Sequence, residues 1–133
     1  MSGYKHIETA IARYIAGRYC SAVETGAGSN LHAARLLFRS GILIRCTDIS
    51  IPRELCTVPY VMDDVTSPDY SFYKCECIYS IRPTEEMIPA LIRLARTVHS
   101  DLLIYHLGFE GTDTPFPVKG CEIPLHLYVT FKN

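Results

Sequence analysis

The sequence predicts an α/β fold with three layers, in which a doubly wound, mostly parallel sheet of about six strands lies between helices. Short apolar runs of strand length alternate along the chain with segments whose apolar residues recur at helical spacing. Several of these runs are apolar throughout, which is typical of parallel strands that are buried on both faces. Right-handed crossovers between such strands give a Rossmann-like layer. At 133 residues, without internal repeats or a long linker, the chain predicts a single domain over residues 1–133.

Two helices and two strands are predicted in the first part of the chain. Apolar residues recur at helical spacing over 6–18 and again over 30–39, so both segments are expected to be amphipathic helices. Residues 20–24 and 41–48 are short apolar strand candidates, and each of them ends in an acid. The order of these elements is that of a βαβ unit preceded by a helix.

The middle of the chain predicts a helical turn and two further strands. A short turn is expected after Pro52, followed by a brief strand over 58–62. Pro59 favours an edge position for this strand, because proline cannot donate a hydrogen bond to a ladder. A fourth strand is expected over 73–80, after the turn-forming residues 67–69.

A third helix and two more strands complete the predicted fold. The helix begins at Thr84, whose hydroxyl we expect to cap it. Pro89 is awkward in this helix unless it falls in the first turn, where its missing N–H is not needed. Strands over 101–106 and 125–131 follow, separated by the proline- and glycine-rich loop 107–124, so the C-terminal half is abbreviated. The residues expected in the core are Ile7, Ile11, Ile15, Val23, Leu37, Ile42, Ile44, Ile78, Leu91, Leu103 and Leu127.

Composition narrows the classes of function. Lys and Arg number 13 against 14 Asp and Glu, so a formal net charge of −1 gives no signal for nucleic acid or anionic lipid. No apolar run could span a bilayer and residues 1–8 do not resemble a signal peptide, so we expect a cytoplasmic protein without a membrane partner. The six cysteines are expected to be structural thiols, because Cys75 and Cys77 are not spaced as zinc ligands, and no histidine set suggests a metal.

Residues 22–30, Ala-Val-Glu-Thr-Gly-Ala-Gly-Ser-Asn, contain the first strand-to-helix loop. Ligands of doubly wound sheets bind beyond the carboxyl ends of the strands, where the strand order reverses, so we expect this loop at the binding crevice. Gly26 permits a sharp turn, and Gly28 lets the main chain approach a ligand closely. The helix that begins near Asn30 points N–H groups at the same place, which favours an anionic group. A phosphate, a sulfonium nucleoside and a plain tight turn all remain compatible with this stretch.

Two acids at later strand ends add to this pattern. Asp48 follows Gly28 by 20 residues, the separation at which an acid accepts hydrogen bonds from a ribose diol. Asp64, at the end of the third predicted strand, is a further candidate at the same edge. The alternative for each is a solvated carboxylate at a turn or helix cap. Leu31 occupies the position where the dinucleotide fingerprint requires Gly or Ala, which counts against NAD or FAD.

The segment Val-Glu-Thr-Gly-Ala-Gly-Ser-Asn, residues 23–30, resembles the first motif of class I methyltransferases, although Asn30 stands where many of them have a third glycine. The resemblance places Asp48 at their ribose-binding acid and the pair Asp64 and Val65 beside adenine. The whole chain is also similar to a small archaeal family of uncharacterised proteins with a reduced version of this fold, marked by Ile-Tyr-Ser-Ile-Arg-Pro at 78–83 and two following glutamates. The resemblance to class I methyltransferases implies S-adenosylmethionine as the cofactor. The residues that it implies for binding are Glu24, Gly26, Gly28, Asn30, Asp48, Asp64 and Val65.

The end of the fourth strand faces the methyl donor in proteins of this architecture, and three residues there are candidates for catalysis. Tyr79 could pack on the ligand, Arg82 could hold a carboxylate or phosphate, and His106 at the end of the fifth strand could act as general base. The alternative interpretations are a core position for Tyr79, an ion pair of Arg82 with Glu85 or Glu86, and a structural role for His106.

Three functions remain open. The first is a small methyltransferase that binds S-adenosylmethionine, a nucleoside-type small molecule. The second is a non-catalytic module that keeps the fold and acts as a sensor or interaction partner, which the abbreviated C-terminal half favours. The third is an NAD(P)-binding protein.

Overall fold

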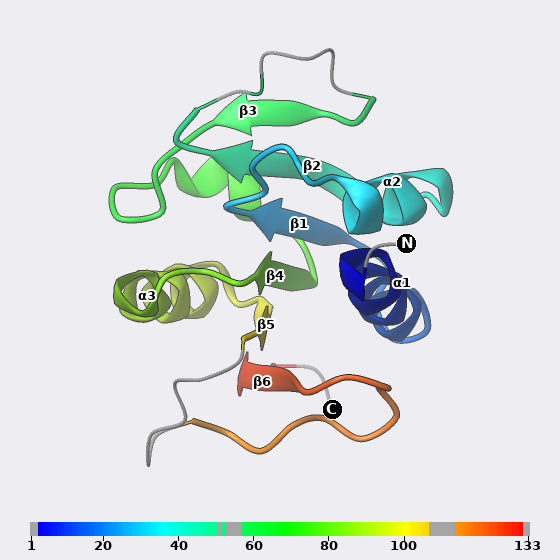
Figure 1. Cartoon of the computed structure of the whole chain (residues 1–133). Coiled ribbons are helices and arrows are strands. Elements are labelled where there is room, and N and C mark those ends of the chain that lie inside the picture. The colour runs from blue at the N-terminus through cyan, green and yellow to red at the C-terminus, as the bar shows by residue number, and fades with distance from the viewer. Residues whose placement is uncertain (1–2, 51, 53–56, 107–113, 132–133) are drawn as a thin grey trace.

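A six-stranded sheet organises the structure, a computed structural model that describes residues 3–50, 52, 57–106 and 114–131 (Figure 1). The sheet has the order β3-β2-β1-β4-β5-β6, and only the pairing of β5 with β6 is antiparallel. The predicted α/β fold with a mostly parallel sheet is therefore confirmed. The strands are β1 (Ala22–Thr25), β2 (Leu43–Asp48), β3 (Tyr60–Met62), β4 (Cys77–Ile81), β5 (Asp101–Tyr105) and β6 (Leu125–Val129).

Helices cover both faces of the sheet and make the three layers. Helices α1 (Gly3–Ala16) and α2 (His32–Arg39) lie on one face, and α3 (Ile88–Val98) lies on the other (Figure 1). Each face has its own apolar cluster, because successive side chains of a strand point to opposite faces. The strand order reverses between β1 and β4, so the carboxyl ends of these two strands form the crevice where ligands of such sheets bind.

The residues predicted for the core pack where the sequence places them. Ile11, Ile15, Val23, Leu37, Ile78, Leu91 and Leu103 are buried. Ile7, Ile42, Ile44 and Leu127 are partly buried and pack against the same two clusters. The described cysteines are free thiols. Cys46 and Cys77 are fully buried, as expected of structural thiols, whereas Cys20 is exposed.

Most predicted strands differ from the observed ones by one or two residues at an end, and the fourth differs more. The segment 73–80 does not form one strand, because Tyr73 ends a 3-10 helix, η1 (Tyr70–Tyr73), and β4 begins only at Cys77. The Asp69 carboxylate starts this helix by accepting bonds from both the backbone N–H and the hydroxyl of Ser71, at 3.1 and 2.7 Å. The last strand ends at Val129, two residues before the predicted end.

The third helix also begins differently from the prediction. Thr84 makes no side-chain cap, and a 3-10 turn, η2 (Glu85–Met87), precedes α3. Pro89 does lie in the first turn of α3, as its missing N–H requires. The edge position of β3 is confirmed, and Pro59 contributes its carbonyl, which accepts the N–H of Cys46 at 2.9 Å.

Two further expectations concern the connecting segments. The turn expected after Pro52 and most of the N-terminal part of loop 107–124 lie outside the described residues. The later part of that loop makes an antiparallel bridge between Pro117 and His126. Among the described helices, none combines the length and the apolar character needed to cross a bilayer.

Candidate functional site

The glycine-rich loop takes the backbone conformation that its two glycines allow. Gly26 and Gly28 have φ angles of 62° and 58°, in the left-handed region that other residues avoid. The Gly28 N–H donates to Oδ2 of Asp48 at 2.7 Å, and the Tyr60 hydroxyl donates to the Gly28 carbonyl at 2.9 Å. The loop after β1 is thereby fixed over the end of β2. Gly26, Gly28 and Asp48 lie on the same rim, as the sequence predicts.

A pocket of about 270 Å³ opens at this rim, near the lower end of the range for small-molecule sites. It contains four of the seven predicted cofactor residues: Gly26, Asp48, Asp64 and Val65. Asp64 is exposed, and its Oδ1 accepts from the backbone N–H and the hydroxyl of Thr66 at 2.9 and 2.7 Å. These two bonds, the backbone one first, lower the pKa of Asp64, so it is a carboxylate at neutral pH.

The pocket also includes residues that sequence reasoning missed. Ile49 and Met87 supply apolar surface, and Ile49 is 68% exposed, which is unusual for a large apolar side chain. The signal for Ile49 was present in the sequence, because it directly follows Asp48 at the strand end. Met87 comes from the turn before α3 and carries no such signal. The remaining lining residues are Thr47, Asp63 and Thr66.

Glu24, another predicted cofactor residue, points away from this pocket and into the layer under α1 and α2. It is 2% exposed, and its Oε1 accepts the Tyr79 hydroxyl at 2.7 Å. Burial raises the pKa of Glu24 to about 8; the Tyr79 hydroxyl opposes this, and the nearby Glu8 adds to it by repulsion. A carboxyl group therefore lies directly under the glycine-rich loop and is largely protonated at neutral pH.

Glu8 of α1 is the second buried acid at this place. It is 1% exposed, and its Oε1 accepts the backbone N–H of Ala33, in the first turn of α2, at 2.9 Å. Burial raises the pKa of Glu8, and the Ala33 N–H, His32, Asn30 and Arg82 oppose this rise. Asn30, the last predicted cofactor residue, is exposed and lies beside Glu8. The amino end of α2 therefore already holds a carboxyl group of the protein.

The three predicted catalytic candidates do not converge on one point. Tyr79 is fully buried and bonded to Glu24. Arg82 is exposed, with its guanidinium carbon 5.2 Å from the centroid of the Tyr105 ring. His106 is 2% exposed, and its Nε2 is 2.7 Å from the Tyr128 hydroxyl. Its ring stacks on His126 with centroids 4.6 Å apart. Tyr79 and His106 thus have partners within the fold, whereas Arg82 faces solvent.

Arg82 has an unusual backbone for a residue with a side chain. Its φ angle is 55°, and its N–H donates to the Tyr105 carbonyl at 2.8 Å at the end of β4. The left-handed region costs about 1–2 kcal/mol for such a residue. Glu85 and Glu86 are both described, and neither makes the alternative ion pair with Arg82. Strained residues cluster at functional sites, so Arg82 is the candidate of the three that geometry favours for contact with a ligand.

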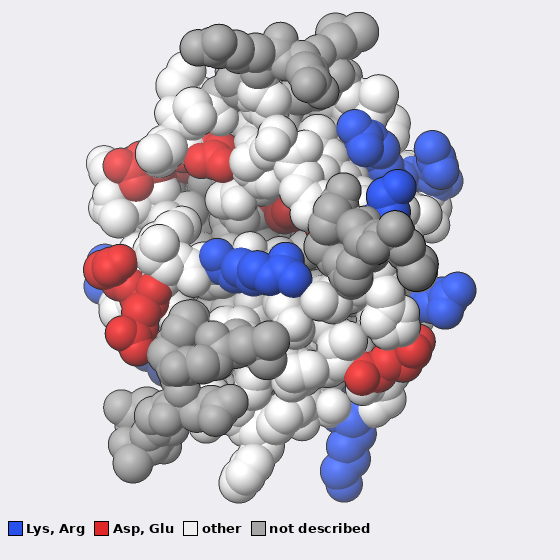
Figure 2. Space-filling model, in the orientation of Figure 1, with Lys and Arg blue, Asp and Glu red and all other residues white. Residues whose placement is uncertain are grey.

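Charges of both signs lie on the face that Figure 2 shows. Acidic side chains gather at one edge of this face, and a basic side chain crosses its centre. In the described part of the chain, no three His, Cys, Asp or Glu residues come together as metal ligands do. The face therefore offers mixed charge rather than a basic surface, as the net charge of −1 implies.

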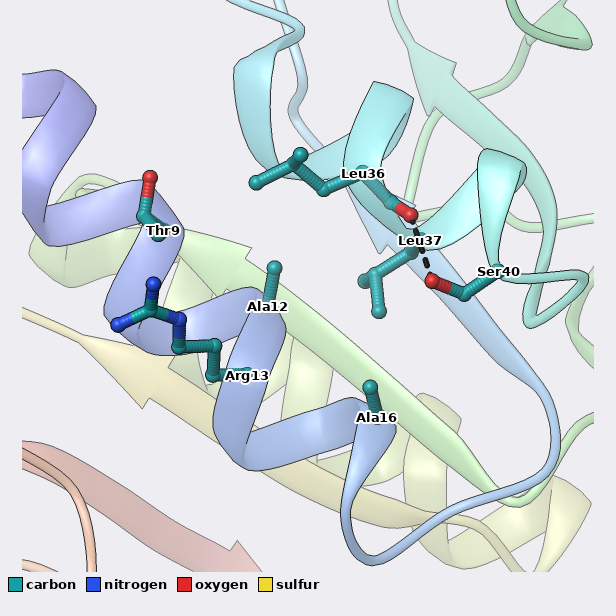
Figure 3. Close-up of a pocket in the computed structure, with 7 residues that line it drawn as sticks. All are labelled: Thr9, Ala12, Arg13, Ala16, Leu36, Leu37 and Ser40. Carbon is teal, nitrogen blue, oxygen red and sulfur yellow. Dashed lines mark hydrogen bonds between the residues drawn. The ribbon is translucent and has the colours of Figure 1, made fainter.

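A second pocket, of about 240 Å³, lies between α1 and α2, in the helical layer instead of at the strand ends (Figure 3). Its polar groups do not converge: the Ser40 hydroxyl donates within α2 to the Leu36 carbonyl at 3.0 Å, and Arg13 extends along α1. The polar groups of a ligand site normally converge on one point, so the pocket at the strand ends is the better candidate. The residues around the second pocket are Thr9, Ala12, Arg13, Ala16, Leu36, Leu37 and Ser40.

Comparisons with known sequences identify relatives over most of the chain. Residues 7–121 match the family described as Uncharacterised protein family (UPF0146). A UPF0146 protein of Archaeoglobus fulgidus is 38% identical over 96 residues, which cover 71% of this chain and 74% of the relative. A UPF0146 protein of Pyrococcus horikoshii is 38% identical over 102 residues, which cover 73% of this chain and 76% of the relative.

A comparison with solved structures concerns the fold. A sugar N-methyltransferase from Streptoalloteichus sp. matches 81% of this chain with a TM-score of 0.54 and 18% sequence identity. The match spans 49% of the methyltransferase chain. At 18% sequence identity, the similarity shows a shared fold and nothing about function. It confirms the predicted Rossmann-like, methyltransferase-like fold, and the archaeal relatives confirm the predicted resemblance to a small archaeal family. On the sequence match over residues 7–121, the chain belongs to the UPF0146 family.

Proposed function

We propose that this chain binds S-adenosylmethionine, or the closely related S-adenosylhomocysteine, in the pocket beside Asp48 and acts as a small methyltransferase. The observation that carries the proposal is the position of the Asp48 carboxylate. Its Oδ2 accepts the Gly28 N–H at 2.7 Å and its Oδ1 accepts the Ile49 N–H at 2.6 Å. Each carboxylate oxygen has a further lone pair, so both can still accept from the two hydroxyls of a ribose.

The other walls of the pocket suit a purine. Ile49, Val65 and Met87 provide apolar surface for the two faces of a flat ring. Exposed Ile49 would lose its contact with water when a ring covered it, which favours binding by roughly 25 cal/mol for each Å² of apolar surface removed. The pocket lies beyond the carboxyl ends of β1 and β2, the end of a doubly wound sheet at which ligands bind, and this position supports the proposal.

The two acids beside the loop support a nucleoside without phosphates over NAD(P). A dinucleotide places its diphosphate on the glycine-rich loop and the N–H groups of the next helix. Here the Ala33 N–H of that helix already donates to Glu8, and Glu24 lies beside it. A diphosphate would find this N–H already bonded to Glu8 and would be repelled by an ionised carboxylate there, whereas a cationic group would be attracted to it.

A second candidate function is that of a ligand-binding sensor or interaction module without catalysis. The observation that favours it is the burial of Tyr79 and His106: the Tyr79 hydroxyl bonds to Glu24, and Nε2 of His106 bonds to the Tyr128 hydroxyl. A general base must reach the proton that it removes. Neither residue presents a polar atom to the pocket beside Asp48.

Thermal unfolding with added ligands tests the binding proposal. At 100 times its dissociation constant, a ligand adds about 2.7 kcal/mol, which raises the melting temperature of a domain of this size by roughly 10 °C. We expect this shift with S-adenosylmethionine and S-adenosylhomocysteine, and none with NAD or NADP. Asp48→Asn should abolish it, because the amide keeps the volume but offers one acceptor atom where the carboxylate offers two.

Asp69→Asn is the matched control, since Asp69 also accepts a backbone N–H at a turn but lies outside the pocket. A shift with NAD in place of the adenosyl compounds would contradict the proposal, as would an unchanged shift in Asp48→Asn. If the adenosyl compounds bind, mass spectrometry of a cell extract incubated with labelled methyl donor separates the two functions. A methylated product that depends on the protein supports the enzyme, and its absence supports the sensor.

A further inference from the structure

A further pocket, of about 290 Å³, lies between α3 and the segment that connects β3 to η1. It shares only Val65 and Thr66 with the pocket beside Asp48. Val65 and Leu94 belong to the buried apolar cluster that α3 covers, so the pocket has apolar residues at its base. The proposed function leaves this concave surface without a role.

Two arginines of α3 line this pocket. Arg93 and Arg96 are exposed, and in the part of the chain that the structure describes neither side chain makes an ion pair or a hydrogen bond. Their separation of three positions places them on one face of the helix, where like charges repel each other, and α3 contains no acid that would offset this. The helix dipole accounts for Arg96 in the last turn, but Arg93 lies one turn earlier. An anion held between the two guanidiniums would remove the repulsion.

The acids that flank the connecting segment are bound within their own turns. Asp64 accepts the backbone N–H and the hydroxyl of Thr66, and Asp69 accepts the same two groups of Ser71. Neither carboxylate lines the pocket, and neither lies within ion-pair distance of the two arginines. Among the described residues, the guanidinium donors are therefore free to bind an anion from outside the chain.

Tyr70 supplies an aromatic ring at the same pocket. It is 47% exposed, and its hydroxyl has no hydrogen-bond partner within the described ranges of the chain. Tyr73, at the other end of η1, is fully buried and donates to Asp63, so packing in the core explains Tyr73 but not Tyr70. A flat ring that stacks on an exposed tyrosine removes apolar surface from water, and nucleic acid bases of every kind stack in this way. The pocket therefore combines an anion site with a stacking surface.

We propose that this pocket binds a nucleoside 5′-phosphate, with the phosphate on the guanidiniums of Arg93 and Arg96 and the base on the Tyr70 ring. A terminal phosphate has three acceptor oxygens and a charge of about −1.5 to −2 at neutral pH, so it can bind two planar guanidiniums at once. A carboxylate has two oxygens and one charge, which match a single guanidinium. The inference goes beyond the proposed function and does not depend on it, because these three residues do not line the pocket beside Asp48.

Calorimetric titration of the intact chain with uridine 5′-monophosphate tests the site, with uridine and inorganic phosphate as partial ligands. Uracil is chosen because the pocket beside Asp48 is proposed to hold adenine. We expect the nucleotide to bind at least about fivefold more tightly than either part, since each part lacks one of the two contacts. Arg93→Gln and Arg96→Gln should each weaken the nucleotide about 10-fold, the low end for a charged hydrogen bond, because both side chains are exposed. Tyr70→Ala should weaken the nucleotide about 5- to 100-fold and leave inorganic phosphate within about twofold.

Arg39→Gln is the matched control, because Arg39 is also an exposed arginine in the last turn of a helix but lies on the other face of the sheet. Losses in the two α3 variants with unchanged binding in Arg39→Gln support the site. Absence of binding to the intact chain overturns it, and so does an equal loss in Arg39→Gln, which would indicate a general charge effect. A loss in Asp48→Asn but not in Arg93→Gln would locate the nucleotide in the other pocket and overturn the inference. Inorganic phosphate that binds as tightly as the nucleotide would overturn it too, because the ring would contribute nothing.

Discussion

Glu24→Gln should change how the stability of the protein depends on pH. In the folded chain, burial raises the pKa of Glu24 to about 8, whereas an unfolded glutamate has its ordinary value of 4.5. Between these two values the folded state keeps a proton that the unfolded state has lost. Unfolding then releases a proton, so the free energy of unfolding falls as pH rises through this window. Below pH 4.5 both states are protonated, and the contribution of Glu24 is at its most favourable.

The size of the effect follows from the width of this window. One pH unit inside it changes the free energy of unfolding by about 1.4 kcal/mol, so a rise from pH 6 to pH 8 costs roughly 2–3 kcal/mol. Glutamine does not titrate, and its carbonyl can still accept the Tyr79 hydroxyl. The variant should therefore lose most of this slope and become more stable than the unaltered chain at pH 8. Glu8 leaves a slope of the same sign, because burial also raises its pKa.

Urea unfolding at pH 5.5, 6.5, 7.5 and 8.5 measures this slope for both chains, and Glu76→Gln serves as the control for removing an exposed carboxylate. An equal fall of stability with pH in Glu24→Gln and in the unaltered chain would refute the reasoning. It would mean that Glu24 is ionised in the folded state, and that neither burial nor repulsion by Glu8 raises its pKa.

Two further predictions concern backbone conformation. His99 ends α3 with a φ angle of 60°, so His99→Gly should raise the free energy of unfolding by up to about 1 kcal/mol. The edge contact between the His99 and Phe131 rings is lost in this variant and reduces the gain. Urea unfolding measures the change, and a lower free energy of unfolding would contradict the prediction. Gly28→Ala should lower the free energy of unfolding by about 1–2 kcal/mol, because φ is 58° there. The added methyl would lie 3.9 Å from Oδ2 of Asp48, an ordinary contact, so the cost is one of backbone strain. An unchanged stability in Gly28→Ala would mean that the loop does not hold this conformation in solution.

The sequence predicted the sheet and the loop well because these depend on local pattern. Apolar runs of strand length fix which segments lie in the middle layer, and the glycine pair with an acid 20 residues later fixes the rim. The 3-10 helix before β4 was missed because it depends on the side chain of Asp69, one carboxylate whose local bonds outweigh the strand preference of the residues that follow.

Glu8 was missed although a signal was present. It precedes Ile11 by three residues and Ile15 by seven, so it lies on the buried stripe of α1 rather than on the solvated face. A buried acid on an apolar stripe needs a hydrogen-bond partner within the protein. Nothing in the spacing says that this partner is the backbone of Ala33, because the contact joins segments 25 residues apart and depends on how α1 and α2 pack. Sequence periodicity predicts which face of a helix is buried, but it does not predict which distant residue that face contacts.

The burial of His106 and Tyr79 also limits the kind of methyl transfer that the site could perform. His106 stacks on His126 and bonds to Tyr128, and Tyr79 bonds to Glu24, so neither is placed to remove a proton from an acceptor in the pocket. Attack on a sulfonium methyl needs a base only when the nucleophile must first lose a proton. A neutral amine attacks with its own lone pair and loses its proton afterwards, whereas an aliphatic hydroxyl needs a base as it reacts. If the labelled methyl group is transferred, we therefore expect it on nitrogen, and a product methylated at an aliphatic hydroxyl would mean that a base other than His106 and Tyr79 takes part, such as the pocket carboxylate of Asp63 or Asp64.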